Sequence, residues 1–471
     1  MTKTFFFYDL ETSGLDPRDD RIMQFAGIRT DEQLQQIGEP VNVLVALNDD
    51  TLPSPDALMV TGVTPQKTVD EGYTEAQFAE MFATEIATPD TTMVGYNNIR
   101  FDDEFMRALL WRTFRDPYEW SYADGRSRWD LLDVVRMVRA LRPEGFEWPV
   151  VDGVPTNRLE LLSAANGIDH ISAHDALSDV EALIGIARLI RTKQPQLFEY
   201  LYSIRDKKSV QQLVSLEAPA PFVYSSGRYE NDHEKTTVAY PVAEAEHGNI
   251  FVYDLRYDPS VWKDLSSEQI QKVLETPADD REEQFRRVPV KKLQYNRSPA
   301  VAPIGVLQQG DAWNRIGLSL DVVEHHIKSL KNDPELGARF AQAIEGRVFE
   351  KSTISDAENL LYDGFVTNRD KLRVEVVRNA TEHELADMKP SFDDVRLTEL
   401  FPRYKARNFP KTLSDDERIS YEQYRRARIT RQIPGFIDAI QKNSIKELTS
   451  HQEFVLTELQ LWYESIIPTD E

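Results

Sequence analysis

Residues 3–14 read KTFFFYDLETSG, a short aromatic run that ends in two acidic residues and a glycine. An uninterrupted apolar run of this length is typical of a strand buried on both faces of a sheet. Successive side chains of a strand alternate between its faces, so Asp9 and Glu11 project on one side, about 7 Å apart along it. The stretch therefore predicts a strand at residues 3–9 that delivers two carboxylates to one face of a sheet.

The residues that follow alternate between strand-like and helix-like segments. Residues 21–29 and 41–47 predict two strands that form an antiparallel meander with the first, and residues 92–96 predict another strand. Apolar residues at helical spacing predict helices at 75–86, 102–112, 131–141, 159–165 and 175–190. We therefore expect a mixed α/β domain that ends near residue 192.

The pattern changes twice in the rest of the chain. A helical connector at 194–216 leads to the Pro-containing segment EAPAP (217–221), which is a plausible boundary. Between 222 and about 303 the apolar period approaches two, in TTVAYPVA (236–243), NIFVYDLRY (249–257) and RRVPVKKLQYN (286–296). From about 351 onward the pattern is helical. We predict an α/β domain at 1–193, a β-rich domain with its helical connector at 194–349, and a helical C-terminal domain at 350–471.

Composition restricts the possible chemistry. The chain has no cysteine, so any metal must be held by oxygen or imidazole, which suits Mg²⁺ or Mn²⁺. Its 79 acidic and 55 basic residues give a formal net charge of −24, which argues against nucleic acid unless positive charge gathers locally. No run approaches the roughly 18 apolar residues of a membrane span, and no signal peptide is recognisable. We therefore expect a cytoplasmic protein.

Two later motifs add acidic residues. Asp102 lies in GYNNIRFDD (95–103) at a junction of strand and helix, where helix capping would be its ordinary role. Residues 174–179 read HDALSD and enter the last helix of the domain. There Asp179 lies against an apolar stripe, where a carboxylate needs a partner, and His174 precedes the helix.

Together these motifs resemble the DEDD exonucleases, in the branch whose last motif contains histidine. The resemblance implies a ribonuclease H-like fold with the acids gathered at one sheet edge, and phosphodiester hydrolysis with two Mg²⁺ ions, for which Mn²⁺ can substitute. It implies that Asp9, Glu11 and Asp179 hold the metal that activates water. Asp9 would also bridge to a second metal supported by Asp102, and His174 would act as the general base.

Further stretches are similar to the bacterial exodeoxyribonuclease I family. They are GYNNIRFDDE (95–104), RDPYEWSY (115–122), SRWDLLDVVR (127–136), ALRPEGFEWP (140–149), ANGIDH with SAHDALSD (165–179), and YKARNFP (404–410). This resemblance implies a ribonuclease H-like exonuclease domain with a mixed sheet, then an SH3-like β-rich domain and an all-α C-terminal domain. It implies a monomer that degrades single-stranded DNA from the 3′ end to 5′-mononucleotides. It also implies a role in DNA repair and recombination, and a partner in single-stranded-DNA-binding protein.

Cations and aromatic residues alternate in the middle of the first domain, as in grooves that bind unpaired strands. They are Arg107, Tyr118, Trp120, Tyr122, Arg126, Arg128, Trp129, Arg136 and Arg142. The family's substrate-binding positions match Glu11, Arg107, Tyr118, Tyr122, Arg136 and Arg158, with Tyr122 where the family has Trp. For each cation or ring, an ordinary surface arginine or core aromatic is the alternative reading.

Two further basic groups have two possible roles. Residues 286–292, with Tyr295 and Arg297, and the later group of Arg403, Lys405 and Arg407 could line a DNA channel or be solvated charges. The first role predicts a positive channel in a negative shell, and binding that weakens with salt. Two other functions stay open at this point, an exoribonuclease and an inactive nucleic-acid-binding protein.

Overall fold

The structure is a computed structural model that describes residues 3–168, 175–347 and 356–467. The chain divides into two compact units. The first comprises Met1–Ser127, His170–Ile184 and Ser352–Glu471, and the second comprises Arg128–Asp169 and Gly185–Lys351. Among the described residues, no helix has both the length and the apolar character needed to cross a membrane.

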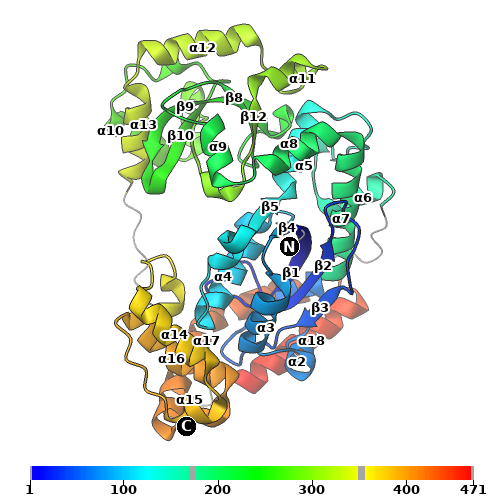
Figure 1. Ribbon diagram of the computed structural model, residues 1–471, viewed down its shortest axis with the longest axis vertical. Helices are drawn as coiled ribbons and strands as arrows, with labels where there is room; N and C mark the ends of the chain where they lie inside the picture. The colour runs from blue at the N-terminus through cyan, green and yellow to red at the C-terminus, as the bar shows by residue number, and fades with distance from the viewer. Residues whose placement is uncertain (1–2, 169–174, 348–355, 468–471) are drawn as a thin grey trace. The chain divides into compact units, whose positions relative to one another are not determined.

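The first unit is built on a mixed sheet with the strand order β3-β2-β1-β4-β5 (Figure 1). Central strand β1 pairs antiparallel with β2 and parallel with β4, while β2 pairs antiparallel with β3. The predicted meander of the first three strands is therefore confirmed. The bounds are β1 (Thr4–Thr12), β2 (Ile22–Thr30), β3 (Val41–Leu44), β4 (Thr91–Gly95) and β5 (Ser127–Asp130), the last beginning where this unit's first segment ends.

Side-chain alternation along β1 separates the core from the acidic residues. The even-numbered side chains in the range Phe6–Leu10 enter an aromatic core with Phe78 of α3 (Glu75–Met81) and Phe105 of α4 (Asp102–Arg112). Because successive residues point to opposite faces, Asp9 and Glu11 lie on the other face of the sheet. The segment predicted as one helix at 75–86 is α3 followed by a π-helical turn, η1 (Phe82–Ile86).

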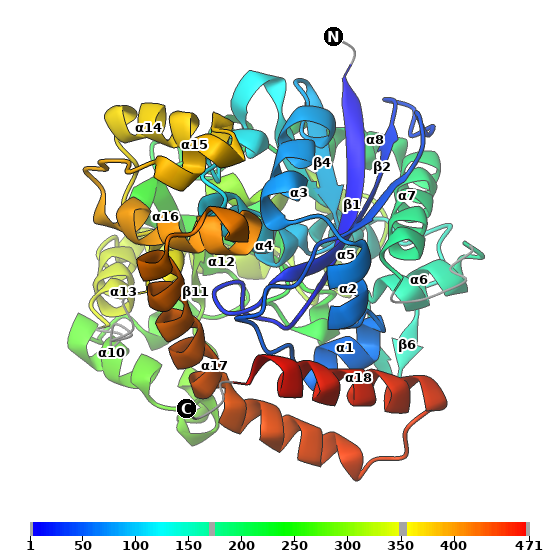
Figure 2. The ribbon, with the colours of Figure 1, turned by 90° about the horizontal axis from the view of Figure 1, so that it is seen from below.

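The C-terminal helices complete this unit. Met23 and Leu58 share a core with Phe436, Leu459 and Trp462. Figure 2 shows α17 and α18 beside the two short helices that follow β3. The helices of this part are α1 (Pro55–Thr61), α2 (Pro65–Glu71), α14 (Asn368–Asn379), α15 (Glu382–Asp387), α16 (Val395–Asn408), α17 (Asp415–Ser444) and α18 (Ser450–Ile466). The prediction of a helical C-terminal region is confirmed.

The second unit contains an antiparallel sheet with the order β11-β10-β9-β8-β12. Its strands are β8 (Phe222–Ser225), β9 (Thr236–Ala245), β10 (Asn249–Asp254), β11 (Val290–Leu293) and β12 (Ala300–Pro303), with a separate pair β6 (Val150–Val151) and β7 (Val154–Pro155). Its helices are α5 (Leu131–Leu141), α6 (Leu159–Ala165), α8 (Pro195–Ser203), α9 (Lys207–Leu213), α10 (Ser267–Glu275), α11 (Ala312–Arg315), α12 (Leu320–Asn332) and α13 (Leu336–Glu345). One helix, α7 (Ala176–Lys193), continues from the first unit into the second. The predicted β-rich region is confirmed, while the predicted domain boundaries stay predictions.

Candidate functional site

Two of the predicted acidic residues lie near the end of the central strand. Asp9 is opposite Ala26 of β2 and Glu11 is opposite Gln24, and the strand register shifts directly after Glu11. The Glu11 side chain belongs to a residue that is only 9% exposed. Continuous pairing with β2 therefore fixes both carboxylates on one face of a rigid strand.

Helix α7 brings a third carboxylate to this pair. One carboxylate oxygen from each of Asp9, Glu11 and Asp179 lies within 4.8 Å of the other two. Asp179 is in the first turn of α7, where the preceding Asp175 accepts hydrogen bonds from the backbone N–H and hydroxyl of Ser178 at 3.4 and 3.3 Å. The fold thus brings Asp179 into one cluster with Asp9 and Glu11, although it lies about 170 residues further along the chain.

The fourth acid, Asp102, begins helix α4 and is 4% exposed. The adjacent turn is held by Asn98, whose side-chain amide donates to the Tyr8 hydroxyl and to Asp103 at 3.4 Å each. Gly95 makes this turn possible, because a Cβ there would lie 2.5 Å from the Cβ of Asn98. Asp102 is not part of the group within 4.8 Å, but its charge acts on that group.

The pKa values of two acids report their crowding. Burial, and then the negative charges of Asp102 and Glu11, raises the pKa of Asp9 well above its usual range. Burial, and then the charge of Asp179, raises the pKa of Glu11 to about 8. Carboxylates this close ionise together only when positive charge compensates them. A hard divalent cation with oxygen ligands fits this donor set.

The predicted general base, His174, lies outside the described residues. Its neighbour Asp175 is described and half-buried at the start of the helix that carries Asp179. The role of His174 stays a prediction.

Three of the predicted substrate-binding residues belong to the same unit as the acids. The guanidinium of Arg107 lies 5.6 Å from the centroid of the Tyr118 ring and donates to Glu104 at 3.0 Å. Tyr122 is 65% exposed, so its ring is available to a ligand. Contact of these residues with nucleic acid stays a prediction.

The structure adds two aromatic residues that sequence reasoning missed. The rings of Tyr362 and Phe365 each lie 6.4 Å from Tyr118, and the hydroxyl of Tyr362 donates to Glu104. Phe365 is 90% exposed, which is unusual for so large an apolar ring. Their only signal in the sequence is an aromatic pair in a segment without helical or strand period, LLYDGFV (360–366).

Two other predicted substrate-binding residues, Arg136 and Arg158, belong to the second unit. Arg136 donates to the buried carboxylate of Asp133 at 2.5 Å, and a Cβ at Gly227 would lie 3.0 Å from its guanidinium. Arg158 is largely exposed and pairs with Glu160. Arg136 is thus fixed by its surroundings, whereas Arg158 is held only at the surface.

Part of the alternating cationic and aromatic segment is structural. Trp120 is 5% exposed and packs edge-on against Phe82 at 5.6 Å. Trp129 is 2% exposed and packs against Phe198 at 5.1 Å. For these two tryptophans the core reading is correct, because their rings face protein and cannot stack with bases. Arg126 donates to the backbone carbonyl of Ala87 at 2.7 Å, so its side chain has a structural role.

The basic residues near the C-terminus are neither a channel lining nor solvated charges. Lys405 is fully buried against Glu417 at 2.8 Å, and Arg403 pairs with Asp356 at 2.5 Å. Arg407 belongs to a buried ion network, defined here as Arg21, Asp50, Glu358, Arg407 and Tyr424. Both roles considered from the sequence are therefore wrong for this group, since its partners are acids that the sequence could not locate.

In the buried ion network, Glu358 accepts hydrogen bonds from Arg21 at 2.8 Å, Arg407 at 2.6 Å and Tyr424 at 3.0 Å. Arg407 also binds Asp50 at 2.5 Å. Burial disfavours the ionised form of Glu358, but the charges of Arg407 and Arg21 hold its pKa well below the usual range. The network joins α16 to the loop after β3, so it stabilises the contact between the C-terminal helices and the N-terminal fold.

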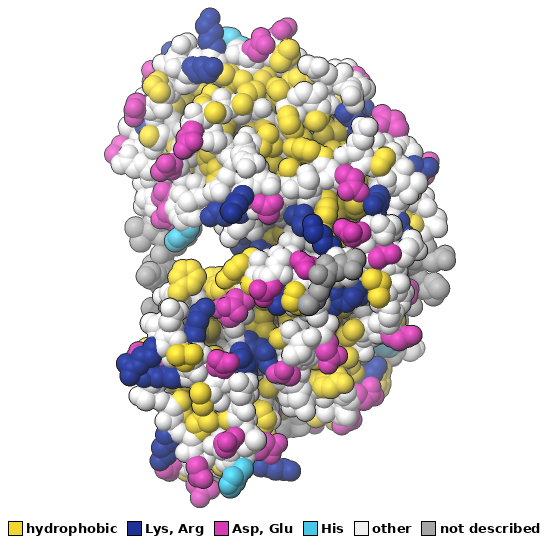
Figure 3. Space-filling model, in the orientation of Figure 1, with side chains coloured by type: hydrophobic (Ala, Val, Ile, Leu, Met, Phe, Trp, Pro, Cys, Tyr) yellow, Lys and Arg dark blue, Asp and Glu magenta, His cyan; other side chains and the backbone are white. Residues whose placement is uncertain are grey.

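Surface charge is mixed on the face of the molecule drawn in Figure 3. On the face drawn in Figure 3, basic and acidic side chains are interspersed, despite the net charge of −24. The basic stretch 286–292 overlaps β11, an edge strand of its sheet, where Lys292 lies 3.7 Å from both Glu246 and Glu345. The predicted positive channel stays a prediction.

Known families and proteins match almost the whole chain. Three family models match, described as Exonuclease at residues 6–187, Exonuclease I SH3-like domain at 205–347 and Exonuclease I C-terminal domain at 355–466. The exodeoxyribonuclease I of Haemophilus influenzae is 38% identical over 466 residues, which cover 98% of each chain.

Solved structures agree with these matches. The exonuclease I of Methylocaldum szegediense superposes with a TM-score of 0.92 at 38% identity, over 99% of this chain and 100% of that one. The exonuclease I of Escherichia coli in complex with a dA16 oligonucleotide gives a TM-score of 0.93 at 34% identity, with the same coverage.

Proposed function

Because the chain belongs to the exodeoxyribonuclease I family, we propose that it degrades single-stranded DNA from the 3′ end and releases 5′-mononucleotides. The observation that carries this proposal is the group of Asp9, Glu11 and Asp179, with carboxylate oxygens within 4.8 Å of one another. The three parts of the chain are the ribonuclease H-like exonuclease domain, the SH3-like domain and the helical C-terminal domain. Their boundaries in this proposal are 1–193, 194–349 and 350–471.

The chemistry depends on divalent metal, and the carboxylates would hold it. Asp9, Glu11 and Asp179 would hold one Mg²⁺, and Asp102 together with Asp9 would support a second, with Mn²⁺ as a possible substitute. When bound, the cations lower the pKa of water and stabilise negative charge on the phosphoryl oxygens. His174 accepts the proton of the attacking water, since an imidazole pKa near neutrality suits a general base.

The substrate strand is held by cations and rings. Arg107 supplies positive charge beside Tyr118, and exposed rings at Tyr122, Tyr362 and Phe365 stack with bases. On the second unit, Arg136 and Arg158 bind backbone phosphates, and at the site Glu11 also contacts the terminal nucleotide. Stacking accepts every base, which suits an enzyme that must degrade strands of any sequence.

Membership of the family also supports a proposal for the cellular setting. The enzyme acts in the cytoplasm in DNA repair and recombination, as a monomer, and meets single-stranded-DNA-binding protein on its substrate. Sedimentation of the purified chain tests the monomer, and co-purification with the binding protein tests that partner.

Digestion of a 5′-labelled single-stranded DNA oligomer tests the proposal. The assay compares Mg²⁺ with EDTA, and single-stranded DNA with its duplex and RNA equivalents. We expect stepwise shortening of single-stranded DNA with Mg²⁺, no turnover by Asp179→Asn, and full activity of Glu181→Gln, which changes an exposed acid on the same helix. Equal or faster degradation of RNA would overturn the DNA assignment, and metal binding without turnover would favour an inactive binding protein.

A pH profile separates the general base from the metal ligands. His174→Ala retains a small activity that no longer changes with pH near neutrality, whereas Asp179→Ala is inactive at every pH. The reason is that metal-bound water is already acidified without the base. Full activity of His174→Ala with an unchanged pH profile would exclude the assigned role.

A further inference from the structure

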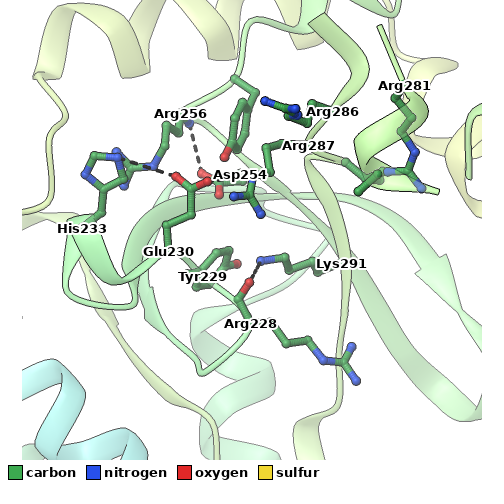
Figure 4. A pocket seen from close by; sticks show the side chains of 13 residues that line it. Arg228, Tyr229, Glu230, His233, Asp254, Arg256, Arg281, Arg286, Arg287 and Lys291 are labelled. Carbon is green, nitrogen blue, oxygen red and sulfur yellow. Dashed lines mark hydrogen bonds and ion pairs between the residues drawn. The ribbon is translucent and has the colours of Figure 1, made fainter. Parts of the chain in front are cut away.

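The β-rich domain contains a basic pocket that shares no residue with the acidic site. It has a volume of about 230 Å³ and is shown in Figure 4. The residues that line it are Arg228, Tyr229, Glu230, His233, Asp254, Arg256, Tyr257, Ala278, Arg281, Arg286, Arg287, Val288 and Lys291. This volume is below the roughly 300–1,000 Å³ of pockets for drug-sized ligands, so it suits a small group.

Positive charge exceeds negative charge in this lining. Six of the lining side chains are cationic and two are acidic. Burial lowers the pKa of His233, so this side chain adds no charge at neutral pH. One acid, Glu230, is paired with Arg287 at 2.8 Å, and the other, Asp254, is buried on β10. The pocket therefore carries an excess of positive charge that its own acids do not balance.

Several of these cations remain available to a ligand. Within the described residues, Arg228 and Arg286 make no ion pair, and both side chains are exposed. In Figure 4 the side chains of Arg256, Arg287 and Lys291 gather around Asp254. Guanidinium groups present paired N–H donors that match the oxygens of phosphate better than they match a spherical anion.

A buried hydroxyl beside the cations is unsatisfied. Tyr229 is 5% exposed, and among the described residues its hydroxyl has no hydrogen-bond partner. The ammonium of Lys291 lies 3.5 Å from the centroid of the same ring and donates to the Arg228 carbonyl at 2.9 Å. A buried polar group without a partner is destabilising, and a ligand oxygen at the pocket would recover that loss.

We propose that the basic pocket binds a phosphate group, carried either by a free phosphomonoester or by a nucleic-acid strand. Arg228 and Arg286 supply the unpaired charge, Arg256, Arg287 and Lys291 surround the group, and the Tyr229 hydroxyl donates to one of its oxygens. The proposal does not depend on the nuclease activity, since it uses no residue of the acidic site.

Isothermal titration calorimetry of the full chain in EDTA tests the pocket without hydrolysis. The three probes are inorganic phosphate, dAMP and an oligothymidylate with a 5′-hydroxyl. The variants are Arg228→Ala/Arg286→Ala and Tyr229→Phe, and Lys208→Ala is the control because it removes an exposed cation of the same unit that does not line the pocket.

Each of the two substitutions in the double variant should weaken binding by at least about tenfold, which corresponds to about 1.5 kcal/mol for one lost charged hydrogen bond. Tyr229→Phe should weaken it by about two- to tenfold without lowering the unliganded melting temperature, because the hydroxyl has no partner to lose. Because Tyr229→Phe keeps every charge, it distinguishes a specific phosphate site from non-specific electrostatic attraction. Weaker binding of phosphate and dAMP identifies a free phosphomonoester as the ligand of the pocket. Weaker binding of the oligothymidylate alone identifies a nucleic-acid strand as that ligand. If both variants bind all three probes as Lys208→Ala does, the pocket is not a phosphate site.

Discussion

Replacing Glu358 with glutamine removes one negative charge from the buried ion network and leaves its shape almost unchanged. The Glu358 side chain is 1% exposed and lies within 2.8 Å of two guanidinium groups, those of Arg21 and Arg407. Removing one partner of a buried ion pair costs about 3–5 kcal/mol, because the remaining charge is left uncompensated away from water. We expect Glu358→Gln to lose stability of this size.

The matched control is Glu422→Gln on α17. Glu422 pairs with Arg425 at 2.8 Å, but its side chain is 44% exposed, so the pair is worth only about 0–1 kcal/mol. The two substitutions make the same chemical change, both in the C-terminal part of the chain. Their difference therefore measures burial and not the loss of a carboxylate as such.

Differential scanning calorimetry is the suitable assay, because the two units can unfold in separate transitions. For a unit of this size 1 kcal/mol shifts the melting temperature by about 2 °C, so Glu358→Gln should lower it by about 6–10 °C. Glu422→Gln should lower it by no more than about 2 °C. Equal shifts for both variants would show that the network adds no more stability than a surface pair, and would refute the reasoning.

Three other changes have defined outcomes. The pKa of Glu11 is raised to about 8, so ionising this side chain costs stability as the pH rises from about 4.5 to 8. Mg²⁺ binds the ionised carboxylate, so it should raise the melting temperature more at pH 8.5 than at pH 6. Equal increases at the two pH values would contradict this prediction. Phe365→Ala should weaken binding of single-stranded DNA about 5- to 150-fold by fluorescence anisotropy in EDTA, without lowering the melting temperature, because the ring is 90% exposed; unchanged affinity would remove it from the substrate site. Gly95→Ala should lower stability by about 1–3 kcal/mol and reduce exonuclease activity, because its Cβ collides with Asn98 beside Asp102; wild-type unfolding and turnover would show that the turn relaxes freely.

Strong local periodicity made several elements predictable. The bounds expected for α4, α5 and α6 are those observed, because each helix has apolar residues at helical spacing and a clear end. Short elements were missed. Helices α1 and α2 each span seven residues, yet Ser54 and Thr64 cap them and proline follows, a signal that was readable. Strand β5, with only four residues, carries too little pattern to be distinguished from a loop.

Contacts distant in sequence limited the prediction of the site. The acids were predicted because a strand end and a helix start fix their side chains locally. The order of the three motifs along the chain then indicated that the acids belong to one site. Arg407 could not be assigned in the same way, since its partner Asp50 is separated from it by more than 350 residues. Phe365 carried no period at all, and only its distance to the Tyr118 ring identifies it.

The core shared by the two ends of the chain also constrains how the protein is made. Met23 and Leu58 are covered by Phe436, Leu459 and Trp462, which leave the ribosome long after the central sheet has been synthesised. Domains generally fold as they emerge during translation. Here the N-terminal domain must wait with an uncovered apolar surface until translation has passed α18. A product of premature termination lacks that cover, so an incomplete chain is a substrate for chaperones and proteases rather than a nuclease released early.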